Sequence, residues 1–191
     1  MTVAAVVLAA GASTRFGEPK QLAKLGGERL LERAVRIAFE AGCEPVVVVL
    51  GAKAAEIEAG CELRAAKVVL NEAWAEGMAS SVRAGLGALP QDLSGIVLMT
   101  CDQPAVTAGH LRKLAAAGEG AATSVTAGSS YAGRVGVPAF FPADRFGELM
   151  GLGGDQGARS LLKAGLAVEL PDGELDIDTV ELLEAARQRY G

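Results

Sequence analysis

The chain has 191 residues, of which 50% are apolar and 21% charged, and its formal net charge is −5. A chain of this length buries roughly 70% of the surface that its unfolded form exposes, so we expect one globular domain over residues 1–191. The acidic balance and the absence of a Lys/Arg run argue against a nucleic-acid surface, because nucleic acids are bound by concentrated positive charge.

The cysteines and the N-terminus indicate the compartment. Cys43, Cys61 and Cys101 lack the C-x-x-C spacing of zinc sites, and their odd number disfavours a disulfide framework. The N-terminus lacks the basic start of a secretory signal, and no window approaches the roughly 20 apolar residues of a membrane span. We therefore expect a soluble, cytoplasmic protein without membrane contact.

Strands and helices alternate in the first half of the chain. Continuous apolar runs predict strands at 3–8, 46–50, 67–70 and 95–100. Apolar residues at helical spacing predict helices at 30–41, 51–59 and 78–89. This alternation is typical of a Rossmann-like, doubly wound α/β fold, with a mostly parallel sheet between two helical layers.

The second half continues the pattern less regularly. Helices are predicted at 108–117, 143–150, 156–164 and 179–189, and strands at 121–126, 167–170 and 175–177. Segment 131–141 is extended but contains glycines and Pro138, so we expect an edge strand or irregular segment that forms a rim for a second substrate. Thr107 is expected to cap its helix, and His110, the only histidine, to be a surface or partly buried side chain rather than a catalytic base.

The loop after the first predicted strand, from Leu8 to Lys20, suits an anion. Gly11 and Gly17 allow a tight turn and close approach of a ligand. Arg15 adds a planar fork for phosphate oxygens, and Lys20 adds a point charge. The glycine spacing matches neither a Walker A loop nor a dinucleotide fingerprint. A polyphosphate is the expected ligand, and a plain strand-to-helix turn with two surface cations is the alternative.

The string Leu-Ala-Ala-Gly-x-Ser-x-Arg-x-Gly-x-Pro-Lys-x-Leu, matched from Leu8 to Leu22, resembles the signature of the nucleotidyltransferases that attach a nucleotide to molybdopterin. It looks most like the cytidylyltransferase branch. The resemblance implies the GT-A-like form of the α/β/α fold and transfer of CMP from CTP to the terminal phosphate of molybdopterin, with release of pyrophosphate. It also implies Mg²⁺ as cofactor and a molybdenum hydroxylase as a partner that receives the product.

The same resemblance assigns roles to residues. Arg15 and the loop amides would hold the β and γ phosphates, Lys20 would reach the α-phosphate, and Asp102 would complete the catalytic set. The implied nucleotide-binding residues are Leu8, Ala9, Ala10, Gly11, Ser13, Arg15, Lys20, Asn71, Gly77, Met78, Ser80 and Ser81.

Base recognition is expected at two places. Segment 71–81 resembles the family stretch that borders the nucleobase, although Ser80 could instead be a helix N-cap, and Trp74 is expected in the core or at the rim. Family members that transfer GMP carry Leu-Ala-Gly-Gly where this chain has Leu-Ala-Ala-Gly at 8–11. The added methyl of Ala10 should narrow the site and favour a pyrimidine.

Two aspartates are the candidate metal ligands. Asp102 follows the predicted strand 95–100, and a lone carboxylate opposite a phosphate loop suits Mg²⁺. Its Asp-Gln-Pro string resembles the metal-binding segment of the family, and an ordinary turn before proline is the alternative. Asp178 resembles a second family ligand, but Glu181 three residues later also fits a helix capping box.

The acceptor is less well specified by the sequence. Residues 154–159 resemble a family segment on the acceptor side, in which Asp155 could cap a helix and Arg159 could meet an acceptor phosphate. Val137 stands where the family has Asn. This departure keeps two alternatives open: another phosphorylated acceptor, such as a sugar or polyol phosphate, and a non-catalytic accessory protein that binds nucleotide or cofactor for a molybdenum hydroxylase.

Overall fold

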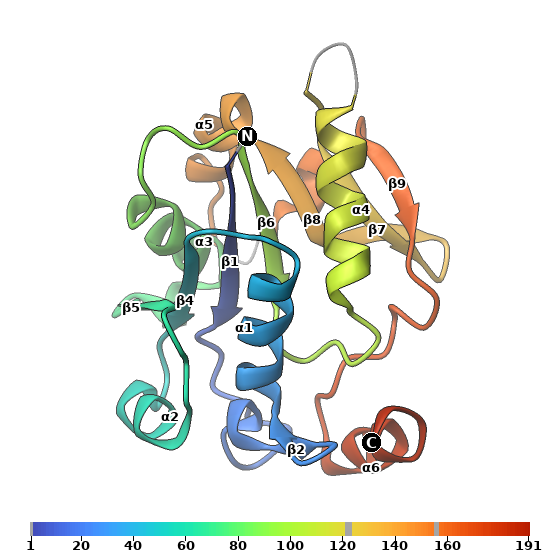
Figure 1. Cartoon of the computed structure of the whole chain (residues 1–191). Helices are drawn as coiled ribbons and strands as arrows, with labels where there is room; N and C mark the ends of the chain where they lie inside the picture. The colour runs from blue at the N-terminus through green and yellow to red at the C-terminus, as the bar shows by residue number, and fades with distance from the viewer. Residues whose placement is uncertain (1, 121–123, 155–156) are drawn as a thin grey trace.

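A seven-stranded sheet forms the centre of the computed structural model, which describes residues 2–120, 124–154 and 157–191 (Figure 1). Its strands are β1 (Val3–Ala9), β4 (Val46–Leu50), β5 (Lys67–Leu70), β6 (Gly95–Thr100), β7 (Ala127–Tyr131), β8 (Arg134–Pro142) and β9 (Leu166–Glu169). Their order in space is β5-β4-β1-β6-β8-β7-β9. A separate two-stranded ribbon is made of β2 (Lys24–Leu25) and β3 (Glu28–Arg29).

Helices cover both faces of this sheet. The α-helices are α1 (Leu30–Glu40), α2 (Ala54–Gly60), α3 (Met78–Gly87), α4 (Ala108–Glu119), α5 (Phe146–Met150) and α6 (Val180–Tyr190). The 3-10 helices are η1 (Lys20–Leu22), η2 (Trp74–Glu76), η3 (Ala143–Arg145) and η4 (Ala158–Leu162). Helices α1 and α4 pack on one face and α3 and α5 on the other, which confirms the three-layer prediction. Among the described residues, no helix is long and apolar enough to cross a membrane.

The central strands are apolar at every position because both of their faces are covered. All five residues of β4 are fully buried, as predicted from the continuous run of β-branched residues. Successive residues of β1 alternate between the two cores: Ala5 and Val7 pack under α1, whereas Ala4 and Val6 pack under α3. Burial of a valine contributes roughly 1.5–3 kcal/mol, so this centre is a firm support for the loops at its carboxyl end.

The prediction that segment 131–141 is an edge strand or an irregular segment is wrong, because most of it forms the central strand β8. β8 pairs antiparallel with β6 on one side and with β7 on the other. Pro138 is tolerated because the β7–β8 register shifts between Gly128 and Ser129, and pairing with β6 begins only at Ala139. The proline therefore lies where both ladders are interrupted.

Three other predicted elements differ from the structure. Residues 175–177 form no strand, because Ile177 is buried against Phe16 and Leu183 instead of joining the sheet. In the strand predicted at 121–126, residues 121–123 lie outside the described chain, and the strand begins at Ala127. The helix predicted at 156–164 starts at a residue outside the described chain and is the short 3-10 helix η4.

His110 is more buried than its helical setting suggested, with only 6% of its surface exposed. Its Nε2 lies 2.7 Å from the Ser129 hydroxyl, which itself donates to the carbonyl of Pro138 over 2.6 Å. Since that hydroxyl has one proton, His110 must be the donor, with its proton on Nε2. Burial, aided by the charge of Lys113, lowers the pKa of His110 to about 4. This histidine therefore joins α4 to the β7–β8 pair as a neutral core group.

The low pKa of His110 predicts a pH-dependent stability. The unfolded chain takes up a proton on this imidazole at a higher pH than the folded chain, so the free energy of unfolding should fall as the pH drops from 6.5 towards 4. His110→Gln keeps an N–H donor but does not titrate. Its free energy of unfolding should therefore fall by roughly 2 kcal/mol less than that of the wild type over this range. Urea titrations at several pH values measure the free energy of unfolding of both proteins. If these free energies changed in parallel with pH, the prediction would be contradicted.

Candidate active site

The loop after β1 and the end of β6 meet at one edge of the sheet. β1 and β6 are parallel neighbours, with Leu8 opposite Thr100, so their carboxyl ends lie side by side. The loop from Leu8 to Lys20, which we call the phosphate loop after its expected ligand, therefore faces Asp102, as the sequence predicts for an open α/β sheet.

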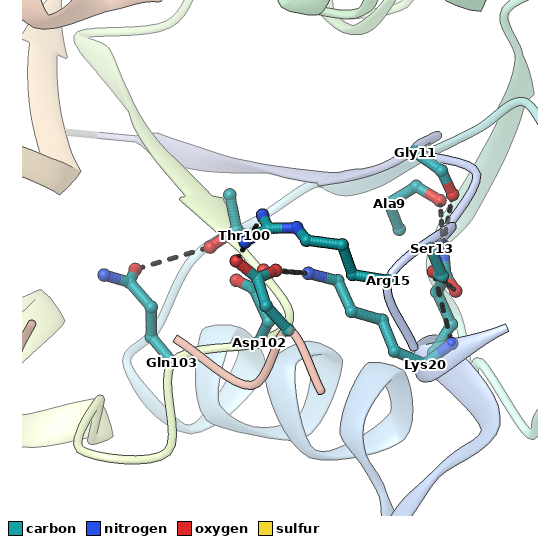
Figure 2. A network of polar contacts seen from close by, with 10 residues as sticks. Ala9, Gly11, Ser13, Arg15, Lys20, Thr100, Asp102 and Gln103 are labelled. Carbon is teal, nitrogen blue, oxygen red and sulfur yellow. Dashed lines mark hydrogen bonds and ion pairs between the residues drawn. The ribbon is translucent and has the colours of Figure 1, made fainter. Parts of the chain in front are cut away.

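An ion cluster joins these two segments to a third one. The Lys20 ammonium lies 2.5 Å from Asp102 Oδ2 and 2.7 Å from Asp178 Oδ1. The Arg15 guanidinium lies 2.7 Å from the other oxygen of Asp178. Figure 2 shows Lys20 and Arg15 extending from the loop towards Asp102 at the end of β6. One ammonium thus contacts two carboxylates from distant parts of the chain.

The pKa values in the cluster follow its geometry. Burial alone would lower the pKa of Lys20, but the contacts with Asp102 and Asp178 outweigh it and raise the pKa above its ordinary range. Burial would raise the pKa of Asp178, but Lys20 and Arg15 outweigh it and hold the pKa below its usual range. For the neighbouring Asp176, burial and the charges of Asp102 and Asp178 raise the pKa to about 6. The raised pKa of Lys20 and the lowered pKa of Asp178 keep both of these side chains charged at neutral pH.

The capping-box interpretation of Asp178 is wrong. Thr179 is the N-cap of α6, and its hydroxyl accepts a hydrogen bond from the Leu182 amide over 3.3 Å. Asp178 turns its carboxylate to Lys20 and Arg15 instead. Nor is Asp102 only a turn residue, because its carboxylate faces the Lys20 ammonium.

The two aspartates form a donor set that fits a divalent cation. The Lys20 ammonium contacts one oxygen of each aspartate, so a single cation in the position of that ammonium can reach both carboxylates. Within the part of the chain that the structure describes, no cluster of three or more His, Cys, Asp or Glu side chains is arranged to hold a metal. Two carboxylates suffice for Mg²⁺ when substrate phosphates and water supply the remaining oxygens. Asp102 and Asp178 are therefore the candidate metal ligands.

Two adjoining cavities lie beside the ion cluster and share Gly11 and Lys20. The larger, of about 410 Å³, is lined by Leu8, Ala9, Ala10, Gly11, Ala12, Lys20, Gln21, Trp74, Ala75, Gly77, Met78, Ser81, Thr100, Cys101 and Asp102. The smaller, of about 200 Å³, is lined by Gly11, Ser13, Thr14, Arg15, Lys20 and Asp178. The larger has space for a base and ribose, whereas the smaller is flanked by the charged groups that suit phosphates.

Asn71 and Ser80 lie behind the larger cavity rather than on its wall. The Asn71 amide donates to the hydroxyls of Ser80 over 2.8 Å and of Ser81 over 3.0 Å. Gly77, not Ser80, is the N-cap of α3, so the N-cap interpretation of Ser80 is wrong. Trp74, 37% exposed, lies at the rim as expected.

Of the two acceptor-side candidates, Arg159 lies away from the ion cluster. Arg159 lines a separate cavity of about 470 Å³ together with Val135 and Lys163, and Asp155 lies outside the described residues. In contrast, Gln21 lines the larger cavity and was not predicted, because it occupies a variable position of the motif and nothing in the sequence shows which way its side chain points.

Comparison with known proteins identifies a family model and several relatives. Residues 5–170 match the model of the MobA-like NTP transferase domain. The chain is 34% identical to the purine catabolism protein PucB of Bacillus subtilis, covering 96% of this chain and 95% of the relative. It is 35% identical to the nicotine blue oxidoreductase of Paenarthrobacter nicotinovorans, covering 94% and 93%. A probable molybdenum cofactor guanylyltransferase of Opitutus terrae is 37% identical over 62% of this chain and 58% of its own length.

A solved structure extends the similarity to three dimensions. The crystal structure of Rv0371C from Mycobacterium tuberculosis in complex with manganese superposes with a TM-score of 0.81 at 31% identity, covering 99% of this chain and 100% of that chain. A divalent metal in this relative is consistent with divalent-metal dependence in the family. Because the family model matches residues 5–170, the chain belongs to the family of MobA-like NTP transferases, which are nucleotidyltransferases.

Proposed function

We propose that this protein transfers CMP from CTP to the terminal phosphate of molybdopterin and releases pyrophosphate. The observation that carries the proposal is the Lys20–Asp102–Asp178 cluster beside a cavity walled by the phosphate loop. Residues 1–191 act as one domain in this proposal. The reaction takes place in the cytoplasm with Mg²⁺ as cofactor, and the product passes to a molybdenum hydroxylase.

The chemistry needs positioning and charge neutralisation more than a base, because the attacking acceptor phosphate is already anionic. An oxygen of the acceptor phosphate forms a new bond to the α-phosphorus of CTP. At the same time, the bond between the α-phosphorus and the oxygen that bridges to the β-phosphate breaks, and pyrophosphate leaves. Arg15 and the loop amides hold the β and γ phosphates, and Lys20 moves from the carboxylates to the α-phosphate. Asp102 and Asp178 would hold a divalent cation, which would supply further charge neutralisation.

The surroundings of Ala10 support a preference for a pyrimidine. Ala10 lines the larger cavity, and its carbonyl accepts a hydrogen bond from the Ala52 amide over 3.1 Å. A Cβ on Gly51 would lie 2.8 Å from that carbonyl, so the backbone at Ala10 is held closely against the end of β4. The backbone of Ala10 therefore has little room to move away from a larger base. Ser81 accepts from Asn71 and can offer its own proton to a cytosine oxygen or nitrogen.

The acceptor keeps a second candidate, because the side chain at position 137 is a valine without the amide that the resemblance implies. The carbonyl of Val137 is used internally, accepting from Gln103 over 3.2 Å and from Tyr131 over 3.1 Å. A sugar or polyol phosphate is therefore the alternative acceptor for the same chemistry. A non-catalytic accessory role is the remaining alternative, and it predicts nucleotide binding without repeated pyrophosphate release.

Removing the charge of Asp102 or of Lys20 should abolish turnover. Asp102→Asn and Lys20→Met keep the size of each side chain, so we expect folded proteins whose pyrophosphate release falls by about 100-fold or more. Asp92→Asn, at an exposed aspartate outside the site, is the matched control and should turn over normally. Near-normal rates in either site variant would contradict the assignment.

The geometry also predicts the metal affinity of the nucleotide-free protein. Lys20 competes with a cation for both carboxylates, so Lys20→Met should bind Mn²⁺ about tenfold or more tightly than the wild type. Electron paramagnetic resonance measures free Mn²⁺ directly. Lys24→Met, which removes an exposed charge four residues away, should change the affinity little. Equal gains in the two variants would show that overall charge, and not the contact of Lys20 with the carboxylates, controls the site.

Base choice should depend on the Ala10 methyl. A methyl-sized difference in a packed pocket contributes roughly 1–3 kcal/mol, or about 10- to 200-fold in specificity. The wild type should prefer CTP over GTP with measurable use of GTP, and Ala10→Gly should reduce that preference. The ratio of kcat/KM values for the two nucleotides tests this. A wild type that prefers GTP, or a ratio unchanged by the substitution, would place base selection in segment 71–81.

A further inference from the structure

Gln21 is buried inside the phosphate loop, with only 1% of its surface exposed. Its side-chain amide donates to the carbonyls of Ala9 over 2.8 Å and of Gly11 over 3.2 Å. Its side-chain oxygen accepts from the Ser13 hydroxyl over 3.2 Å, and that hydroxyl accepts from the Lys20 amide over 3.3 Å. One side chain thus connects the beginning, middle and end of the loop, which Figure 2 shows around Ala9, Gly11, Ser13 and Lys20.

These bonds fix the orientation of the loop peptides. In a trans peptide, the carbonyl and the following N–H point to opposite sides of the chain. Holding the carbonyls of Ala9 and Gly11 on Gln21 therefore also sets the direction of the next two amides, those of Ala10 and Ala12. It also occupies two carbonyl oxygens that would otherwise repel a phosphate in the adjoining cavity.

The same bonds hold a strained residue. Ser13 has φ of 53°, in the left-handed region that residues other than glycine rarely adopt. Its carbonyl accepts from the amides of Phe16 and Gly17, while its hydroxyl lies between Gln21 and the Lys20 amide. The turn that carries Arg15, and the backbone from which Lys20 extends, are both anchored on this residue.

We propose that Gln21 is the positioning residue of the nucleotide site: its buried amide holds backbone carbonyls and so keeps the loop in the conformation that binds polyphosphate. The inference rests on the proposed nucleotide function and deepens it. The role requires an N–H donor towards Ala9 and Gly11, and an apolar side chain of the same size does not replace it.

Two variants separate this role from simple space filling. Gln21→Met keeps the length but has no donor, so its affinity for CTP with Mg²⁺ should fall about tenfold or more at every pH. Gln21→Glu can donate to a carbonyl only when the new carboxyl is protonated, and burial raises the pKa of such a group. Its affinity relative to the wild type should therefore recover as the pH falls from about 8 to about 5.5.

Isothermal titration with CTP and Mg²⁺ across this range measures the affinities, and thermal melts at each pH show that the variants are folded. Gln21→Met binding as tightly as the wild type, or a Gln21→Glu to wild-type ratio that does not change with pH, would overturn the inference. Absence of CTP and GTP binding by the wild type itself would instead contradict the proposed function, so the two failures are distinguishable.

Discussion

The site depends on one electrostatic constraint: two carboxylates lie close together at the edge of a largely apolar sheet, and a cation must accompany them. Asp102 and Asp178 would repel each other if the Lys20 ammonium did not contact both. Since each residue comes from a different segment, this contact also joins the phosphate loop, the end of β6 and the start of α6. In the proposed mechanism, a nucleotide that draws Lys20 to its phosphates would free the two carboxylates to bind a divalent cation.

Apolar packing holds in place the segments that carry this charged contact. Phe16 in the phosphate loop packs with Leu30, Ile177 and Leu183 in a small core of its own. The Ile177 amide donates to the Asp102 carbonyl over 2.9 Å, which places Asp178 next to the end of β6. The C-terminal segment is therefore held by buried side chains and a backbone bond as well as by ion pairs. This explains why α6 lies at the loop end of the molecule, beside β2 (Figure 1).

Local signals in the sequence predicted the sheet centre and the phosphate loop, whereas long-range partners were not predictable. Continuous apolar runs such as 46–50 indicate burial on both faces by themselves. The central place of β8 depends on a register shift in its partner strand, which the composition of β8 does not show. Asp178 could not be distinguished from a cap, because both roles need an aspartate before a helix. Gln21 was missed because its amide nitrogen donates to backbone carbonyls, which carry no sequence signal.

The most direct test of the account is to identify the products of the reaction. The wild-type protein is incubated with CTP, Mg²⁺ and either molybdopterin or a sugar phosphate, and phosphorus NMR with mass spectrometry follows every phosphorylated species. The account predicts one pyrophosphate for each molybdopterin that acquires a CMP unit, over many turnovers. Formation of a cytidylylated sugar instead would show that the acceptor is a sugar phosphate and that the nucleotidyl transfer itself is correctly assigned. Saturable CTP binding without any pyrophosphate would contradict the claim that this cluster transfers a nucleotide.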